Sequence, residues 1–554
     1  MAKAAVRATA VTEKELRALR VILAVSVFLN GLYSEFFAAL AAAALLVWLW
    51  RRKELSLRLH WPLLAVALLF LGSGLSCIWA VDRGLAPFGL TKTFPLLLMA
   101  LCLQQLNEAQ RSRCLDDLPA LGALMVVLSY PLQFVPVISD YFCVSGRIAG
   151  FFQYPNSFAC FLLLGLERLF LTLGEPKKAS LRIAEAAALC FGLIQSGSRA
   201  VFALALMFLG AFLFVSLRGK RLRASLPLLG GVMIGLALCW PASLLSAAAL
   251  QHLGELSPGA STFLGRLLYA KDALPVILRH PLGLGYLGYW MSQGSFQHGV
   301  YAVRWVHNDL LQLFLDYGWL PALAAAAAGI TSLLSKRGGA SRRVLLLTLL
   351  AHCLFDFDLA FDAIFFVLLL LLDWEAGQEK RLRPGLFPRV MAALCAAVLL
   401  WLGAAASAED LNPDLALKLY PRHSSALSRT LPTLPDTVSM ARRADQILAL
   451  DNDVTLAWDA KALYAYQQGD FQSFILAKRE ALRCSPYAQE EYDDAVGKLK
   501  IGEMLYRQAG DEASAAICRQ EIESIRERMQ AVLDTTDPLA WRLADQPELH
   551  FPEE

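Results

Sequence analysis

Long apolar runs separated by short polar connections dominate the first 406 residues of the chain. Most runs approach the ~20 residues that an α-helix needs to cross a lipid bilayer. Helices are expected because they satisfy their own backbone hydrogen bonds in lipid. The pattern predicts an all-α polytopic membrane domain over residues 20–406, with about 12–13 transmembrane helices. The runs lie at about 20–33, 36–50, 61–80, 88–105, 118–137, 154–173, 183–196, 200–217, 224–245, 310–332, 344–358, 360–373 and 388–406.

Beyond residue 406 the chain becomes polar. Four prolines indicate a linker over residues 407–436, and helical periodicity follows. Small and aromatic residues between Ala457 and Phe471 resemble the pattern of tetratricopeptide helical hairpins. We therefore expect residues 437–554 to form a helical, tetratricopeptide-like tail. Such a tail is either a concave surface for a protein partner or acceptor, or a small helical cap. The prolines are Pro413, Pro421, Pro432 and Pro435.

The composition agrees with a membrane protein and excludes other classes. Hydrophobic residues make up 57% of the chain and charged residues 18%, below the ~25% of soluble domains, which argues against disorder. A net charge of +3 over 554 residues provides no basic surface for nucleic acid. Its 11 cysteines contain no CxxC pair, so we expect no zinc or iron–sulfur site. Whether Cys484 and Cys518 pair in the tail stays open.

The basic residues of the connections are distributed unevenly. About 25 of them, including the five between Lys3 and Arg20, belong to one set of alternate connections. The positive-inside rule places that set, and the N-terminus, in the cytoplasm of a plasma-membrane protein. An odd number of spans then places the tail outside. The opposite connections hold Arg83, Lys92, Arg147, Arg199, Arg266, Lys271, Arg279 and Arg304.

The arginines of this outer set suggest an anionic ligand. Guanidinium groups bind phosphate through a planar fork that is always charged, although structural ion pairs are an equal alternative for any one arginine. The longest outer connection, about 246–309, contains Arg266 and a glycine- and aromatic-rich stretch from His280 to Trp290. Connections of this length are usually functional or disordered, and the aromatic residues favour an ordered lid or site.

Five segments occur in a suggestive order, and together they resemble the O-antigen ligase and O-antigen polymerase superfamily of integral membrane glycosyltransferases. The resemblance covers about residues 60–375. One departure is that the usual Arg-x-x-x-Leu of the ligases reads Arg266-Leu-Leu-Tyr-Ala270 here. The segments are Arg147–Asn156, Ser196–Arg199, Gly265-Arg266 with His280–Gly285, His307-Asn308 followed by Gly318 after ten intervening residues, and His352–Asp356.

The resemblance implies a GT-C-like fold and an activity. A glycan would pass from an undecaprenyl-diphosphate carrier to an acceptor hydroxyl on the outer face, without cofactor or metal. Arg147, Arg199 and Arg266, with Arg304 as a further candidate, would stabilise the departing diphosphate. His307 would be the general base, or alternatively a ligand of the phosphate, because imidazole titrates near neutral pH.

The remaining motif residues have structural expectations. Asn156 and Gly318 belong to the family patterns, and Asn308 is placed to cap the helix that follows it. We expect Asp356, with Asp358 and Asp362, to form ion pairs with the arginines.

The acceptor is left open by the sequence. Ligation to a glycolipid or glycan is the first interpretation, and polymerisation of repeat units or transfer to a protein hydroxyl are alternatives within the same superfamily. A transporter of lipid-linked glycans is an alternative of another class, which predicts internal repeats and charges near the bilayer midplane. The expected partners are the lipid-linked donor, one of these acceptors and membrane lipid.

Overall fold

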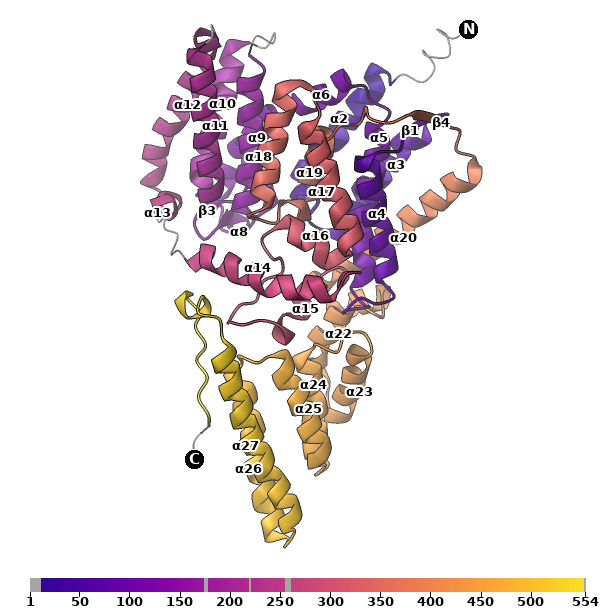
Figure 1. The fold of residues 1–554 in the computed structure, drawn as a ribbon, viewed down its shortest axis with the longest axis vertical. Coiled ribbons are helices and arrows are strands. Elements are labelled where there is room, and N and C mark those ends of the chain that lie inside the picture. The colour runs from indigo at the N-terminus through magenta and orange to yellow at the C-terminus, as the bar shows by residue number, and fades with distance from the viewer. Residues whose placement is uncertain (1–10, 174–177, 219–220, 255–260, 553–554) are drawn as a thin grey trace.

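The computed structural model describes residues 11–173, 178–218, 221–254 and 261–552. A bundle of apolar helices is joined at one end to a narrower helical tail (Figure 1). The all-α class predicted from the sequence is confirmed. Residues 1–10 of the predicted N-terminal segment and 255–260 of the predicted outer connection lie outside the described residues.

Each predicted apolar run contains helix. The helices of the bundle are α2 (Glu13–Phe28), α3 (Glu35–Trp50), α4 (Trp61–Ser76), α5 (Gly89–Leu103), α6 (Glu108–Leu115), α7 (Leu118–Leu132), α8 (Ser139–Phe142), α9 (Pro155–Leu171), α10 (Ala179–Ser196), α11 (Arg199–Leu217), α12 (Arg221–Ser243), α16 (Asp309–Tyr317), α17 (Trp319–Leu334), α18 (Gly339–Cys353), α19 (Asp362–Leu371) and α20 (Leu386–Leu411). The long connection adds α13 (Ala248–Gly254), α14 (Ser261–Arg279) and α15 (Gly288–Met291). Short 3₁₀ turns are η1 (Asn30–Leu32), η2 (Ala86–Phe88), η3 (Gly150–Phe152), η4 (Gln293–Ser295) and η5 (Asp358–Ala360).

The run predicted as one helix over 310–332 is two helices, α16 and α17. The break falls at Gly318, whose φ of +84° is in the region that favours glycine. The run 310–332 is largely apolar, and a pattern of apolar residues indicates burial but not backbone conformation. The break therefore could not be predicted from it. The prediction of a single helix here is wrong.

Five helical segments among the described residues are long and apolar enough to cross a membrane. Shorter apolar helices, α3, α4, α17 and α19, accompany them. The larger number of crossings expected from the sequence stays a prediction. The five segments are Ala86–Leu103, Glu108–Leu132, Arg199–Leu217, Leu222–Ser243 and Leu386–Leu411.

Two helices form the centre of the bundle. α9 and α19 are buried along nearly their whole length. Helices that are apolar on all sides are expected in the interior of a bundle. α9 begins with Pro155, which suits the first helical position because it lacks an N–H to leave unpaired. The beginning of this central helix, with Asn156, is thereby fixed at one end of the bundle.

Several basic connections gather at the end of the bundle that is far from the tail. There β1 (Leu55–Arg58) pairs antiparallel with β4 (Glu379–Leu382) (Figure 1). Arg58 and Arg111 both bind Glu375, which follows α19. Connections distant in sequence therefore share one face, as the charge pattern predicted; which side of the membrane this face occupies stays a prediction.

At the opposite end, α14 lies across the bundle and the tail begins (Figure 1). The tail consists of α21 (Pro413–Leu419), α22 (Ser424–Thr430), η6 (Leu431–Thr433), α23 (Thr437–Leu448), α24 (Thr455–Gln467), α25 (Phe471–Cys484), α26 (Gln489–Gln508), α27 (Glu512–Thr535) and η7 (Ala540–Arg542). The segment expected as a linker, 407–436, is thus partly helical. Cys484 and Cys518 are buried free thiols.

A pair of buried carboxylates marks the junction between tail and bundle. Asp82, after α4, accepts hydrogen bonds from the hydroxyl of Ser424 and from two backbone N–H groups. Beside it, the Arg83 N–H donates to the Leu450 carbonyl at 3.1 Å. Asp451 is 1% exposed, and burial together with the neighbouring Asp82 raises its pKa to about 8.

This junction should make stability depend on pH. The folded pKa of Asp451 is above its ordinary value, so its contribution to stability is complete below about pH 4 and is lost as pH rises towards 8. We expect wild-type protein to lose more stability between pH 5 and pH 8 than Asp451→Asn, measured by urea unfolding of purified protein. Exposed Asp493→Asn is the control, and an equal loss in Asp451→Asn and wild type would contradict the assignment.

Candidate active site

A buried carboxylate, Asp356, lies between α18 and α19 at the end of the bundle that faces the tail. It is 0% exposed. Its Oδ1 accepts hydrogen bonds from the Tyr154 hydroxyl at 2.8 Å and from His307 Nδ1 at 3.1 Å. Its Oδ2 accepts from Asn156 Nδ2 at 2.7 Å and from Arg266 at 2.9 Å. One carboxylate therefore joins three distant segments of the chain to its own.

The charge of Asp356 follows from these neighbours. Burial raises the pKa of Asp356, but the Arg266 guanidinium and the hydrogen bond from His307 outweigh burial. The pKa is held well below its ordinary value, so the group is a carboxylate at neutral pH. An ionised carboxylate only accepts hydrogen bonds, and His307 Nδ1 must therefore be the donor.

Arg147 reaches the same group from a hairpin. β2 (Cys143–Val144) pairs with β3 (Arg147–Ile148), and both residues of the turn have positive φ, as the tightest hairpins require. Arg147 Nη2 donates to Asn156 Oδ1 at 2.7 Å. Asn156 thus bridges Arg147 to Asp356, which explains why an amide, with both donor and acceptor, occupies this position.

The Ser196–Arg199 turn is in contact with this hairpin. Arg147 Nε donates to the Ser196 carbonyl at 2.7 Å, and Arg199 donates to the Thr262 hydroxyl on α14 at 2.6 Å. Burial lowers the pKa of Arg147; Tyr154 and Asp356 oppose this effect, and the charges of Arg199 and Arg266 add to it. The three arginines expected to hold diphosphate therefore come together near Asp356.

His307 precedes α16 in a strained conformation. Its φ is +54°, which is unusual for a residue with a Cβ and is found preferentially at functional sites. Its ring meets Phe357 at 5.0 Å and Tyr269 at 6.2 Å, centroid to centroid. The next residue, Asn308, accepts from the Leu311 N–H at 3.0 Å, so the predicted helix cap is confirmed.

Two glycine-containing segments, residues 281–285 and Gly318, hold α16 in place by direct backbone contact. The Trp319 N–H donates to Pro281 O at 2.9 Å and the Gly285 N–H donates to Asp316 O at 3.2 Å. A Cβ on Gly318 would lie 2.5 Å from Pro281 O, and one on Gly283 would lie 2.7 Å from Gly318 N. The spacing of His307 and Gly318 thus reflects a helix anchored at both of its ends.

Arg304 belongs to a different group of side chains. It lies 3.6 Å from Glu35, and its guanidinium carbon is 5.5–5.7 Å from the ring centroids of Tyr33, Trp290 and Trp305. The structure does not bring it into contact with the residues around Asp356 that it describes. Of the four arginines proposed from the sequence, Arg304 is the one held elsewhere.

Two further acidic residues do not pair with arginine as expected. Asp358 binds His352 Nδ1 at 2.5 Å, and Asp362 lies 3.3 Å from Lys92. The prediction that all three aspartates pair with arginines is correct only for Asp356. Asp358 and Asp362 begin η5 and α19, which point them into the bundle.

Two groups among the described residues have donor atoms close enough to hold a metal ion. They are Cys160, His352 and Asp358, and Asp309, Cys353 and Asp358. Both depend on Asp358, whose oxygens already accept hydrogen bonds from His352 and Ser157. A metal would have to displace these bonds.

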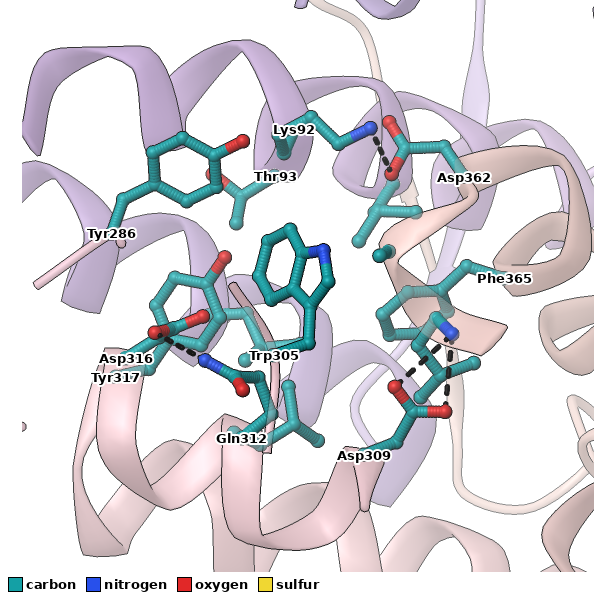
Figure 2. Close-up of a pocket in the computed structure, with 15 residues that line it drawn as sticks. Lys92, Thr93, Tyr286, Trp305, Asp309, Gln312, Asp316, Tyr317, Asp362 and Phe365 are labelled. Carbon is teal, nitrogen blue, oxygen red and sulfur yellow. Dashed lines mark hydrogen bonds and ion pairs between the residues drawn. The ribbon is translucent and has the colours of Figure 1, made fainter. Parts of the chain in front are cut away.

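A small cavity lies inside the bundle near this end. Its volume is about 40 Å³, which is enough for water and too small for a sugar. Figure 2 shows the Lys92–Asp362 pair on one side and Gln312 donating to Asp316 on the other, with Trp305 between them. Asp356 does not line the cavity, so the cavity is separate from the Asp356 group.

Three contributors to the site were not singled out from the sequence. Tyr154 donates to Asp356, Thr262 accepts from Arg199, and Tyr269 lies beside His307. Tyr154 lies inside the segment Arg147–Asn156 and could have been found there. The other two lie on α14; Tyr269 lies inside the quoted segment Arg266–Ala270 but is not one of its motif positions, and no pattern distinguishes Thr262.

Comparison with protein families gives one result. Residues 185–327 match a family model described as O-antigen ligase, and the match includes Arg199, Arg266, His307 and Gly318. Comparisons with curated proteins and with solved structures found no match. The family and the apolar helices indicate an integral membrane protein with ligase- or polymerase-type glycan transfer. This match, which lies within the range over which the motifs resemble the family, supports membership of the O-antigen ligase and polymerase superfamily.

Proposed function

We propose that the protein transfers a glycan from an undecaprenyl-diphosphate carrier to an acceptor hydroxyl on the outer face of the plasma membrane. The observation that carries the proposal is the convergence of Arg147, Arg266 and His307 on Asp356. The family match supports a lipid-linked donor and a glycan acceptor. Ligation is our first assignment.

His307 acts as the general base. Its Nδ1 donates to Asp356, which leaves Nε2 to accept the proton of the acceptor hydroxyl. The hydroxyl oxygen forms a bond to the sugar C1 as the bond from C1 to the diphosphate breaks. Asp356 stabilises the imidazolium that results and stays ionised throughout.

The arginines stabilise the leaving group. Negative charge grows on the diphosphate oxygens as the bond breaks, and fixed cations outside bulk water stabilise that charge strongly. Arg147 and Arg266 are held by hydrogen bonds before substrate arrives, so little reorganisation is required. This set takes the place of a metal ion in the proposal.

We also propose an orientation for the chain. The end of the bundle with the hairpin, α14 and the tail faces outward, and the end with the β1–β4 sheet faces the cytoplasm. The support is the gathering of basic connections at the second end. Residues 20–406 then carry out transfer, and residues 437–554 form an outer domain available to a partner.

The test is incubation of purified protein with an undecaprenyl-diphosphate glycan and separate acceptors, with product size as the readout. A single added block on a glycolipid or glycan supports ligation. A ladder of repeats identifies a polymerase, and a modified protein identifies transfer to protein. No product with any acceptor would contradict the proposal.

Replacing Arg199 with lysine should lower transfer about 10–100-fold, the equivalent of losing a charge-assisted hydrogen bond. A lysine keeps the charge but cannot form the planar fork. Initial rates at saturating donor provide the measurement. Arg279→Lys, at the exposed end of α14, is the matched control. Wild-type kinetics in Arg199→Lys would remove this arginine from diphosphate binding.

Chelation should leave transfer unchanged, because arginines replace the metal in this mechanism. The measurement is the initial rate after treatment with EDTA and after treatment with a membrane-permeable chelator. The permeable reagent covers the buried group of Cys160, His352 and Asp358. A loss of activity that added metal restores would contradict the metal-free mechanism.

A further inference from the structure

The end of the tail returns to the bundle and packs against the long connection, residues 246–309. Residues 536–543, here called the clasp, follow α27 and include η7. The Asp537 carboxylate binds Lys271 on α14, and the Asp537 N–H donates to the His298 carbonyl at 2.8 Å. The clasp therefore holds two parts of the connection at once.

Apolar packing also stabilises the contact between the clasp and the long connection. Ala540 and Leu543 of the clasp form a buried cluster with Leu264 and Leu268 of α14. A Cβ on Gly299 would lie 2.6 Å from Ala540 Cβ, so the 298–301 stretch approaches the clasp as closely as its glycine allows.

The two faces of α14 have different roles. Leu264, Leu268 and Lys271 follow one another at helical spacing and meet the clasp. Arg266 is two residues from Leu264, about 200° around the helix, and it points to Asp356. Thr262, which binds Arg199, shares the face of Arg266. A shift of α14 on the clasp would therefore move Arg266.

A second line of contacts leads from the clasp to His307. Asp272 on α14 is 4% exposed and accepts from the His298 N–H at 3.0 Å and the Tyr301 hydroxyl at 2.7 Å. The Tyr301 ring packs on Tyr269 at 4.6 Å, and Tyr269 in turn meets His307.

We propose that the clasp is a positioning element of the active site. It sets α14 and the 298–307 stretch so that Arg266 and His307 reach Asp356 together, and Asp537 and Lys271 are positioning residues. The proposal rests on the proposed function for its kinetic test. It gives the tail a part in catalysis that is separate from any partner it binds.

The test compares three variants of the full-length protein. Lys271→Glu places a carboxylate against Asp537, and Lys271→Arg keeps the pair. Lys461→Glu is the matched control, because it breaks the 2.7 Å pair with Asp445 within the tail and away from the clasp. We expect Lys271→Glu to lower kcat about 10–100-fold with KM for donor nearly unchanged, since misplacement by about 1 Å has effects of this size.

Lys271→Arg should have a kcat near that of the wild type, and Lys461→Glu should not lower kcat. A wild-type kcat in Lys271→Glu, or an equal loss in Lys461→Glu, would overturn the proposal. Hydrogen exchange supplies a readout that does not need activity. Lys271→Glu should speed exchange in residues 262–272 and 298–308 while α9 stays protected, and unchanged exchange there would overturn the clasp even if the wild type transfers no glycan.

Discussion

Replacing His307 with alanine should lower glycan transfer by at least about 100-fold, because the acceptor hydroxyl loses its general base. The protein should still fold, since the ring is at the edge of the site and helix α16 keeps its Asn308 cap. Initial rates of purified variant and wild type, at saturating donor and acceptor, measure the effect. His307→Gln provides a second variant, because its longer side chain keeps a polar amide without a group that can act as general base.

His280→Ala is the matched control for this prediction. His280 is exposed near the end of α14 and should leave the rate within about twofold, as surface substitutions usually do. If His307→Ala and His307→Gln both turn over at the wild-type rate, His307 has no catalytic part and the base lies elsewhere. A raised KM for donor with unchanged kcat would instead assign His307 to phosphate binding.

Asp356→Asn is expected to have the second large effect, a loss on the order of 10³–10⁴-fold in kcat. The change removes the charge that balances Arg266 and the acceptor that fixes the His307 tautomer, and substitution of the carboxylate in a comparable histidine pair has an effect of this order. Stability should fall as well, by about 3–5 kcal/mol, because the change breaks an ion pair between the buried Asp356 and the partly buried Arg266. Rates and urea unfolding of the same preparation measure both.

Asp316→Asn separates loss of the site from loss of the fold. Asp316 is also buried near this end, where it accepts from Gln312 at 2.9 Å, but it does not line the Asp356 group. We expect a modest change in stability and a rate within a few-fold of wild type. A rate in Asp356→Asn no lower than in Asp316→Asn would contradict the central place of Asp356.

Most of the helical architecture could be predicted because burial in lipid or in a bundle leaves a direct pattern of apolar runs. α9 and α19, for example, coincide with runs predicted at 154–173 and 360–373. The break at Gly318 could not be predicted from that pattern. It depends on a backbone contact with Pro281, which is distant in sequence and leaves no periodic signal.

The candidate site was predictable in part for a similar reason. Arg147, Arg199, Arg266 and His307 were identified because arginine is unusual in outer connections and the motifs occur in order. Charge alone could not separate Arg304, which pairs with Glu35 among aromatic rings. Pairing of distant residues depends on packing that one sequence does not report.

The contribution of the tail was the least predictable feature. Its contacts with α14 involve ordinary residues such as Lys271, Ala540 and Leu543, which carry no motif. Only the return of residues 536–543 to the bundle brings them beside the helix that holds Arg266. The sequence therefore left two interpretations of the tail, a surface for partners or a small helical cap.

In the proposed mechanism, the residues around Asp356 hold the diphosphate of a lipid-linked glycan donor. The most direct measurement is the position of that diphosphate in a structure of the purified protein bound to the donor. We expect phosphate oxygens within hydrogen-bond distance of Arg147 and Arg266, with the sugar C1 on the side of His307 Nε2. A diphosphate bound at the opposite end of the bundle, or in contact with neither arginine, would contradict this mechanism.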